Sequence, residues 1–506
     1  MKPILPIVRR ATAALALAAA GCTSAPPPAV ETPQPQITPV TVTPPAVPTL
    51  NRTVPPVLGA VRPLTVPRVE ERTLENGLRI LVVEHHELPV VDAQLIVRTG
   101  GEADPARHTG LAGIMAQMLS EGTTTRSALQ IADQEAFLGI SVDAGSGWDA
   151  SFVTLHAPTR VLDSAMALFA DVALRPSFPQ RELERIRKER LTDLLQLRDR
   201  PSAIASRAFS TLLFGQEHPY GRPLSGTEAS VRNITRSDLR TFFDRYYRPN
   251  NATLVVVGDV TPDDVVRRAT ALFGGWKRAN VPTTTVAAAT PPARTTVYLI
   301  DKPGAPQSSM RLGTVGVARS TEDFFPLMVM NTVLGGAFTS RLNQNLREKH
   351  GYTYGAGSSF GMRRAPGPFL AQAEVVAAKT DSALIEFMRE LKGVRENLPV
   401  DEVEKAKQYL QLGLPNEFET TSDIAGKLAT LAIYDLPLDY YQSYAQRLSQ
   451  VSAADVQRVA QRYVTPENLA IVIVGDRKAI EQGVRSVGIG DVEIRDIHGA
   501  KVMAKP

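Results

Sequence analysis

RYYRPNNATLVVVGD, residues 245–259, decides the fold of this 506-residue chain because a second copy of the stretch follows it. Residues 462–476 read RYVTPENLAIVIVGD and align with the first copy without gaps, 217 residues further along. Eight of the fifteen positions are identical, including the proline and the final Gly-Asp. Solenoid repeats recur every ~20–50 residues, so a period this long indicates two duplicated domains.

The order of the predicted elements repeats as well, which argues against a chance match of one strand. Short apolar runs predict strands, and apolar positions three and four apart predict helices. In the first copy the expected strands are residues 78–84, 90–97, 140–144, 151–156 and 251–258, and the expected helices are residues 110–120, 161–172 and 179–197. In the second copy the expected strands are residues 295–300, 309–315, 352–360 and 369–376, with a helix at residues 324–334. The sequence therefore predicts an α+β protein of two tandem homologous domains.

Length and composition set the domain boundaries. A chain of 506 residues with 43% apolar and 21% charged residues is too long for one core and has the composition of a globular protein. Residues 280–294 are rich in Pro, Thr and Ala and form the expected linker. The domains are then residues 69–279 and 295–490, followed by a tail of residues 491–506. The net charge of +4 is small, so nucleic acid is not an expected partner.

The first 68 residues carry signals for export. Residues 1–21 have a basic start and an Ala- and Leu-rich apolar run, which is the layout of a signal peptide. The AAGC sequence that ends at Cys22 resembles a bacterial lipobox, so Cys22 is the expected lipidation site; a free cysteine beside an ordinary cleavage site is the alternative. Residues 22–68 are dense in Pro and Thr and predict an extended tether. Because Thr23 follows Cys22, resemblance to lipoprotein sorting rules predicts a periplasm-facing protein that its lipid anchors to the bacterial outer membrane.

Residues 109–123, TGLAGIMAQMLSEGT, resemble the active-site helix of the pitrilysin/insulinase-like zinc peptidases, also called inverzincins. In that family H-x-x-E-H lies between a TGLA-like lead-in and an ML-x-x-GT tail. Here the five motif positions read GIMAQ, so the two ligand positions hold Gly113 and Gln117 and the position of the general base holds Ala116. The third family ligand, a glutamate before a D-x-P segment, falls on Asp193.

This replacement removes the expected metal chemistry from the chain. Glycine has no ligand atom, a neutral amide is a poor zinc ligand, and one carboxylate alone cannot hold the metal. None of the seven histidines forms a pair four residues apart that could replace the motif. We therefore expect no zinc and no other cofactor in this chain, and no self-sufficient metallopeptidase.

Residues 334–360, LGGAFTSRLNQNLREKHGYTYGAGSSF, carry a second resemblance. In bacterial two-component members of the family, one chain supplies zinc and base, while the other supplies an Arg and a Tyr from a motif like S-R-L-x-x-x-x-R-E-x-x-G-x-x-Y. The motif matches from Ser340 to Tyr354, and the resemblance makes Arg347 and Tyr354 the candidate catalytic pair. Their donors could hold a peptide carbonyl and stabilise the developing oxyanion. Gly351 can take the left-handed conformation that ends a helix and turns the chain back.

Two plainer interpretations of this pair stay open. Arg347 could simply pair with a nearby carboxylate or with carbonyl groups at the helix end, and Tyr354 could be a half-buried strand residue. Tyr352 shares a strand face with Tyr354, so the choice between the two tyrosines depends on the seven-residue spacing.

The resemblance covers roughly residues 69–490 and implies two α/β rolls, each a mixed sheet with helices packed on it, that form half of a clam-shell peptidase. It implies a homologous partner subunit that carries the intact motif and its zinc, and peptide substrates that the two chains enclose. The alternative is a catalytically inactive binding or scaffold protein at the outer membrane, which would explain the lost ligands equally well. The retained Arg347 and Tyr354 favour the peptidase subunit, because a scaffold has no chemical need for them.

Overall fold

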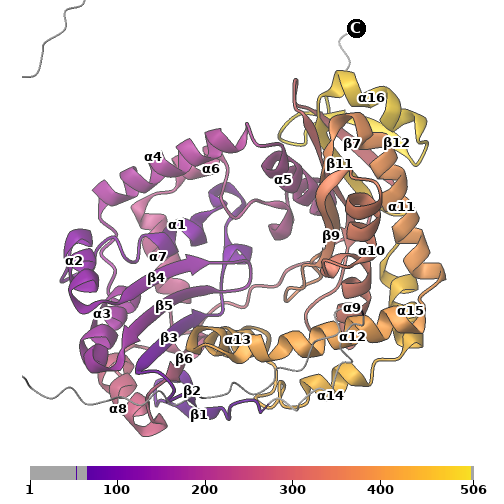
Figure 1. The fold of residues 1–506 in the computed structure, drawn as a ribbon. Helices are drawn as coiled ribbons and strands as arrows, with labels where there is room; N and C mark the ends of the chain where they lie inside the picture. Colours follow the sequence, from indigo (N-terminus) through magenta and orange to yellow (C-terminus); the bar gives the residue numbers. More distant parts are fainter. Residues whose placement is uncertain (1–52, 54–64, 503–506) are drawn as a thin grey trace, which may run out of the picture. The chain divides into compact units, whose positions relative to one another are not determined.

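The computed structural model describes residue 53 and residues 65–502, and two six-stranded sheets organise that part of the chain (Figure 1). The predicted signal peptide, Cys22 and nearly all of the predicted tether lie outside the described residues. In the part of the chain that is described, no helix combines the length and the apolar character needed to span a bilayer.

The first sheet is mixed, with the strand order β1-β2-β6-β3-β5-β4. β2 and β6 are parallel, and the other neighbouring strands are antiparallel. Its strands are β1 (Glu70–Thr73), β2 (Arg79–Glu84), β3 (Val90–Val97), β4 (Ser141–Ser146), β5 (Ser151–Pro158) and β6 (Ala252–Gly258). The helices of this half are α1 (Leu111–Gln117), α2 (Ala128–Leu138), α3 (Leu162–Leu174), α4 (Gln180–Leu197), α5 (Pro201–Phe214), α6 (Glu228–Asn233), α7 (Arg236–Tyr246) and α8 (Pro262–Phe273).

The second sheet repeats this plan with the order β12-β7-β11-β8-β10-β9. Its strands are β7 (Thr296–Asp301), β8 (Gln307–Val315), β9 (Thr353–Phe360), β10 (Pro368–Val376), β11 (Ala470–Gly475) and β12 (Asp491–Arg495). The helices are α9 (Phe324–Asn331), α10 (Arg341–Asn343), α11 (Thr380–Glu396), α12 (Val400–Gly413), α13 (Thr421–Tyr434), α14 (Tyr444–Ser449), α15 (Ala453–Tyr463) and α16 (Arg477–Ser486). Two π-helical turns, η6 (Thr332–Gly336) and η7 (Gln344–Lys349), follow α9 and α10.

The two repeated stretches form equivalent inner strands, which explains their sequence. Every residue of β6 and of β11 is buried. Strands covered on both faces read as continuous apolar runs and show no alternation, as in LVVV and IVIV. The duplication seen in the sequence is therefore a duplication of the sheet core.

The predicted start of a tail at residue 491 is wrong, because β12 pairs in parallel with β7 and belongs to the second sheet. The same edge of the first sheet is occupied by β1, which is the first strand of its half, whereas β12 is the last strand of the second half. The duplication therefore does not predict a strand after α16. A five-residue edge strand is also too short to show a clear apolar periodicity.

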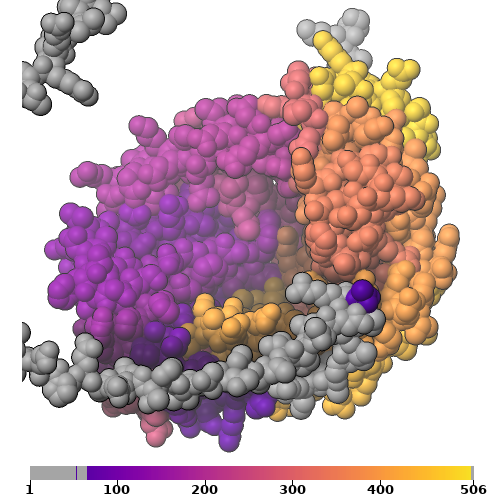
Figure 2. Space-filling model, in the orientation of Figure 1, coloured from indigo at the N-terminus to yellow at the C-terminus, as the bar shows by residue number. Residues whose placement is uncertain are grey.

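Each half gives one helix to the sheet of the other half. α5 packs on β8 and β11 of the second sheet, and α13 packs on β3 and β6 of the first. Ile204 and Phe209 of α5 share a buried cluster with Val472 and Val474 of β11. Figure 2 shows the light-orange surface of the α13 region lying against the purple first half. Because burial of apolar area is the main source of stability, the two halves hold each other together.

Candidate functional site

The helix that resembles the family's active-site helix is α1, and a buried carboxylate fixes its start. Asp104 accepts hydrogen bonds from the backbone N–H groups of Gly110 (2.7 Å) and Ala112 (2.9 Å). Burial raises the pKa of Asp104 to about 7, although these two hydrogen bonds oppose the rise. Gly110 has a φ of +91°, and a Cβ there would lie 2.9 Å from Gly226. Backbone geometry therefore explains the glycine of the TGLA-like lead-in.

The Gly-Thr pair after the helix also has a structural role. Gly122 has a φ of +138°, which a side chain would strain. The Thr123 hydroxyl donates to Asp171 of α3 (2.6 Å), whose side chain is fully buried and also pairs with Arg126 (2.5 Å) and Arg175 (2.6 Å). The frame of the motif is thus kept by packing, whatever the chemistry at the ligand positions.

At the family's ligand positions the structure has a hydrogen bond between two helices. The Gln117 side-chain oxygen accepts from Nη2 of Arg190 on α4 (3.1 Å). Gly113 and Ala116 offer no ligand atom, and Asp193 is exposed on α4. Arg190 lies three residues before Asp193 and therefore on the same helix face. Sequence reasoning misses Arg190, although this spacing from the expected ligand position was a usable signal.

These residues do not fit a zinc ion. Three deprotonated protein ligands are needed, and here a guanidinium that would repel a metal cation already occupies the amide oxygen. Within residues 65–502 and residue 53, no group of three or more His, Cys, Asp or Glu side chains is placed to hold a metal. We therefore assign no step of any reaction to a metal held by this chain.

Arg347 and Tyr354 lie on the two sides of a tight chain reversal between η7 and the edge strand β9. Gly351 makes the reversal in the predicted left-handed conformation, with a φ of +63°. Its N–H donates to the carbonyl oxygen of Arg347 (3.0 Å), and the N–H of Tyr352 donates to that of Leu346 (2.9 Å). π-helical turns such as η7 are frequent at functional sites.

Tyr352 and Tyr354 do not share a strand face as predicted, because β9 begins at Thr353 and Tyr352 precedes it. Tyr354 is 91% exposed, so its interpretation as a half-buried strand residue is wrong. Tyr352 stacks on His350 with ring centroids 4.9 Å apart. Of the two, Tyr354 therefore has the more exposed side chain.

Arg347 is positioned by an aromatic ring. Its Cζ lies 4.5 Å from the centroid of the Phe338 ring, and Phe338 is 62% exposed. Its Nε is 3.5 Å from a carboxylate oxygen of the neighbouring Glu348. A partly exposed ion pair at this distance contributes little energy, so most of the guanidinium donors are available to another acceptor. In the part of the chain that the structure describes, no hydrogen bond or cation–π contact joins Arg347 to Tyr354.

Comparison with protein families identifies the relatives of both halves. Residues 79–228 match the model described as insulinase (peptidase family M16), and residues 233–410 match the one described as peptidase M16 inactive domain. The chain belongs to the M16 peptidase family. The predicted family is confirmed, and the inactive-domain match contains the Arg347 and Tyr354 motif.

Curated M16 relatives extend over most of the chain. A protein of Rickettsia bellii, named an uncharacterized zinc protease, is 24% identical over 410 residues, which are 79% of this chain and 96% of the relative. A Bacillus subtilis protein with the same description is also 24% identical, over 80% of this chain and 98% of its own length. A Mycobacterium leprae relative reaches 32% identity, but over 56% of this chain and 63% of its own length.

Solved structures confirm the predicted fold of two mixed sheets with helices packed on them. A peptidase M16 inactive domain from Pseudomonas fluorescens superposes with a TM-score of 0.76 at 26% identity, covering 80% of this chain and 98% of its own. A protease from Helicobacter pylori gives 0.75 at 22% identity, covering 81% of this chain and all of its own. This chain is thus an M16 peptidase homologue of the inactive-domain type.

Proposed function

We propose that this chain is the subunit without zinc in a heterodimeric zinc-dependent peptidase. It supplies Arg347, Tyr354 and part of the chamber to a homologous partner that carries the metal. The observation that carries the proposal is the 91% exposed Tyr354, which follows the Arg347 turn on an edge strand and offers its hydroxyl outward. An outward tyrosine has no packing role that would explain it.

The chain's own chemistry in this proposal is carbonyl binding. The Tyr354 hydroxyl and the N–H groups of Arg347 donate to a carbonyl oxygen of a bound peptide. The Phe338 ring holds the guanidinium in place, so the donors are aimed before the substrate arrives. Donors fixed in this way stabilise the negative charge that develops on the carbonyl oxygen during attack.

The lost ligand positions support a division of labour between two chains. Gln117 and Arg190 fill the site with a hydrogen bond, so hydrolysis by this family's chemistry needs a second subunit. The names of the curated relatives, which are called zinc proteases, make a zinc-carrying homologue the proposed partner. The proposal also places the complex in the periplasm, with Cys22 lipidated and anchored to the outer membrane.

The test is reconstitution with a zinc-binding M16 protein from the same source. The soluble form without residues 1–66 is assayed for peptide cleavage, alone and after mixing. Cleavage is expected only in the mixture, and Tyr354→Phe and Arg347→Ala should each lower it by roughly 10²–10³-fold, the cost of losing an oxyanion donor. Tyr352→Phe is the matched control and should keep nearly full activity, because that ring stacks on His350.

Two results would change the assignment. Cleavage in the mixture that neither Tyr354→Phe nor Arg347→Ala reduces would favour a scaffold role for this chain. Cleavage by the isolated chain with stoichiometric zinc would overturn the interpretation of Gln117 and Arg190.

A further inference from the structure

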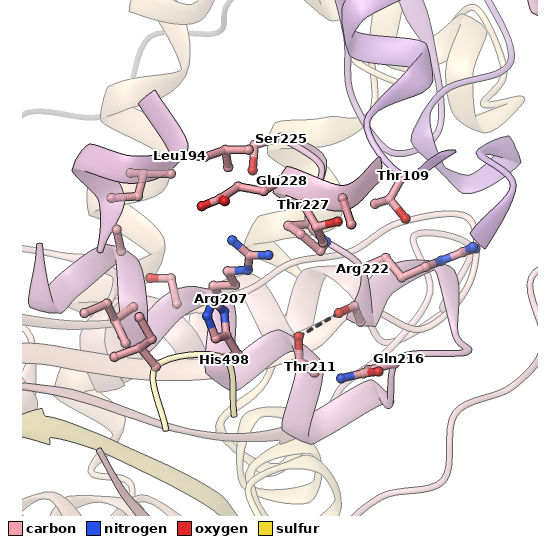
Figure 3. A pocket seen from close by; sticks show the side chains of 18 of the residues that line it. Thr109, Leu194, Arg207, Thr211, Gln216, Arg222, Ser225, Thr227, Glu228 and His498 are labelled. Carbon is pink, nitrogen blue, oxygen red and sulfur yellow. Dashed lines mark hydrogen bonds between the residues drawn. The ribbon is translucent and has the colours of Figure 1, made fainter. Parts of the chain in front are cut away.

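A cavity of about 630 Å³ lies between the end of α4, α5 and the segment that leads into α6 (Figure 3). Leu194, Leu197, Ile204 and Ile497 give it apolar wall area. Its volume lies in the range of about 300–1,000 Å³ that is usual for small-molecule sites. The cavity is separate from Arg347 and Tyr354, neither of which lines it.

The C-terminal turn closes part of this cavity. Ile497 and His498 line it, although they are nearly 300 residues from α5 in the sequence. Asp496 fixes the turn by accepting hydrogen bonds from the backbone N–H groups of His498 (2.9 Å) and Ala500 (2.8 Å). The wall is thus a built feature of the fold.

Of the arginines that line the cavity, Arg207 has no hydrogen-bonded or ion-paired residue among those that the structure describes. Arg207 points into the cavity (Figure 3), and no residue that the structure describes makes a hydrogen bond or ion pair with it. Burial lowers the pKa of Arg207, and the like charge of Arg198 lowers it further. Glu228 lies nearby but is already paired with Arg198. Arg222, on the same cavity, is compensated by Asp104 and Glu217.

We propose that the cavity binds a small molecule with one oxyanion, a carboxylate or a phosphate, and an apolar body. The oxyanion accepts hydrogen bonds from the Arg207 guanidinium, whose planar donors match both groups. The apolar body packs against Leu194, Ile204 and Ile497. The negative charge of Glu228 repels the bound anion and so lowers the affinity. Removing this carboxylate should therefore tighten binding.

Calorimetric titration of the full-length protein with hexanoate and hexyl phosphate tests the site. Saturable binding of at least one of them in a 1:1 ratio is expected, and the tighter one identifies the oxyanion. Arg207→Met should weaken that binding by at least about tenfold, the loss of a charged hydrogen bond, while Glu228→Gln should tighten it several-fold. Exposed Arg160→Met is the charge-matched control and should change nothing. A melting temperature for each variant reports whether it is folded.

Several results would overturn the proposal. Neutral hexanamide binding as tightly as hexanoate, or unchanged binding in folded Arg207→Met, would exclude recognition of an oxyanion. Weaker binding in Glu228→Gln would exclude the charge arrangement described here. Inorganic phosphate binding as tightly as hexyl phosphate would exclude a role for the apolar wall.

Discussion

Gln117 accepts a hydrogen bond from Arg190 at the position that corresponds to the second histidine of the H-x-x-E-H motif. We expect the guanidinium to hinder any attempt to restore the metal. A variant with Gly113→His and Gln117→His gains two imidazoles one turn apart, and Asp193 lies on the facing helix. With Arg190 present its zinc affinity should be weak, and adding Arg190→Leu should raise it by at least about tenfold, because one positive charge beside a dication is removed.

Zinc content after equilibrium dialysis measures this difference. Lys188→Leu, an exposed change of the same charge on the same helix, is the control and should leave the affinity as it was. Equal affinity with and without Arg190 would show that the guanidinium moves aside at no cost, contrary to the prediction.

Among single residues, the sequence predicts those that belong to a motif of residues close together along the chain. The loss of ligand atoms at Gly113 and Gln117 and the spacing of Arg347 and Tyr354 are all readable along the chain. The contact between Arg190 and Gln117 is not, because the two residues are 73 apart, and only the place of Arg190 three residues before Asp193 indicates it. Arg207 is harder still, since its lack of a partner depends on Arg198 having taken Glu228.

Among the elements, the strands follow their sequence patterns closely, whereas the exchange of α5 and α13 between the two sheets does not. An amphipathic helix has an apolar face in its sequence, but nothing in that pattern says which of two equivalent sheets will cover it. The π-helical turns η6 and η7 are likewise invisible in a periodicity of 3.6 residues, since each inserts one residue into a helical run.

The packing of α5 on β8 predicts a strong effect at Gly313. A Cβ there would lie 2.0 Å from the carbonyl oxygen of Phe369 and 2.7 Å from the ring of Phe209 on α5. Gly313→Ala should therefore lower the free energy of unfolding by roughly 1–3 kcal/mol, the usual cost of overpacking a core.

Urea unfolding followed by circular dichroism measures the change at Gly313. Gly426 on α13 serves as the control. It is exposed, and an added Cβ there has nothing within 4 Å, so its replacement should change the free energy of unfolding in the opposite direction. Gly426→Ala should stabilise the protein by up to about 1 kcal/mol through helix propensity. A neutral Gly313→Ala would mean that β10 and α5 do not lie this close to Gly313 in solution.

At the scale of the whole molecule, the two halves meet at a buried polar cluster that no single sequence motif predicts. Asp149 of the first half accepts hydrogen bonds from the hydroxyl of Tyr220 (3.1 Å) and from the backbone N–H of Arg364 in the second (2.9 Å). The Arg363 guanidinium lies 4.3 Å from the centroid of the Tyr220 ring. Glu102, 5% exposed, has Arg364 Nη1 3.8 Å away. The contacts of Arg364 with Asp149 and Glu102 join residues more than 200 apart, which is why a duplicated sequence predicts two domains but not the surface that joins them.

This cluster makes stability depend on pH through Glu102. Burial raises the pKa of Glu102 to about 8 from an ordinary value of 4.5, although the hydrogen bond from the Gly100 N–H opposes the rise. Between those values the folded state binds more protons than the unfolded state, so the free energy of unfolding should fall as pH rises from about 5 to about 8, by up to ~1.4 kcal/mol per pH unit.

Glu102→Gln has nearly the same shape without the titration, and its urea-unfolding free energy should change less steeply over this range. Exposed Glu87→Gln should keep the slope of the unchanged protein. Equal slopes for Glu102→Gln and the unchanged protein would mean that Glu102 is ionised in the folded state, with Arg364 as its counter-ion.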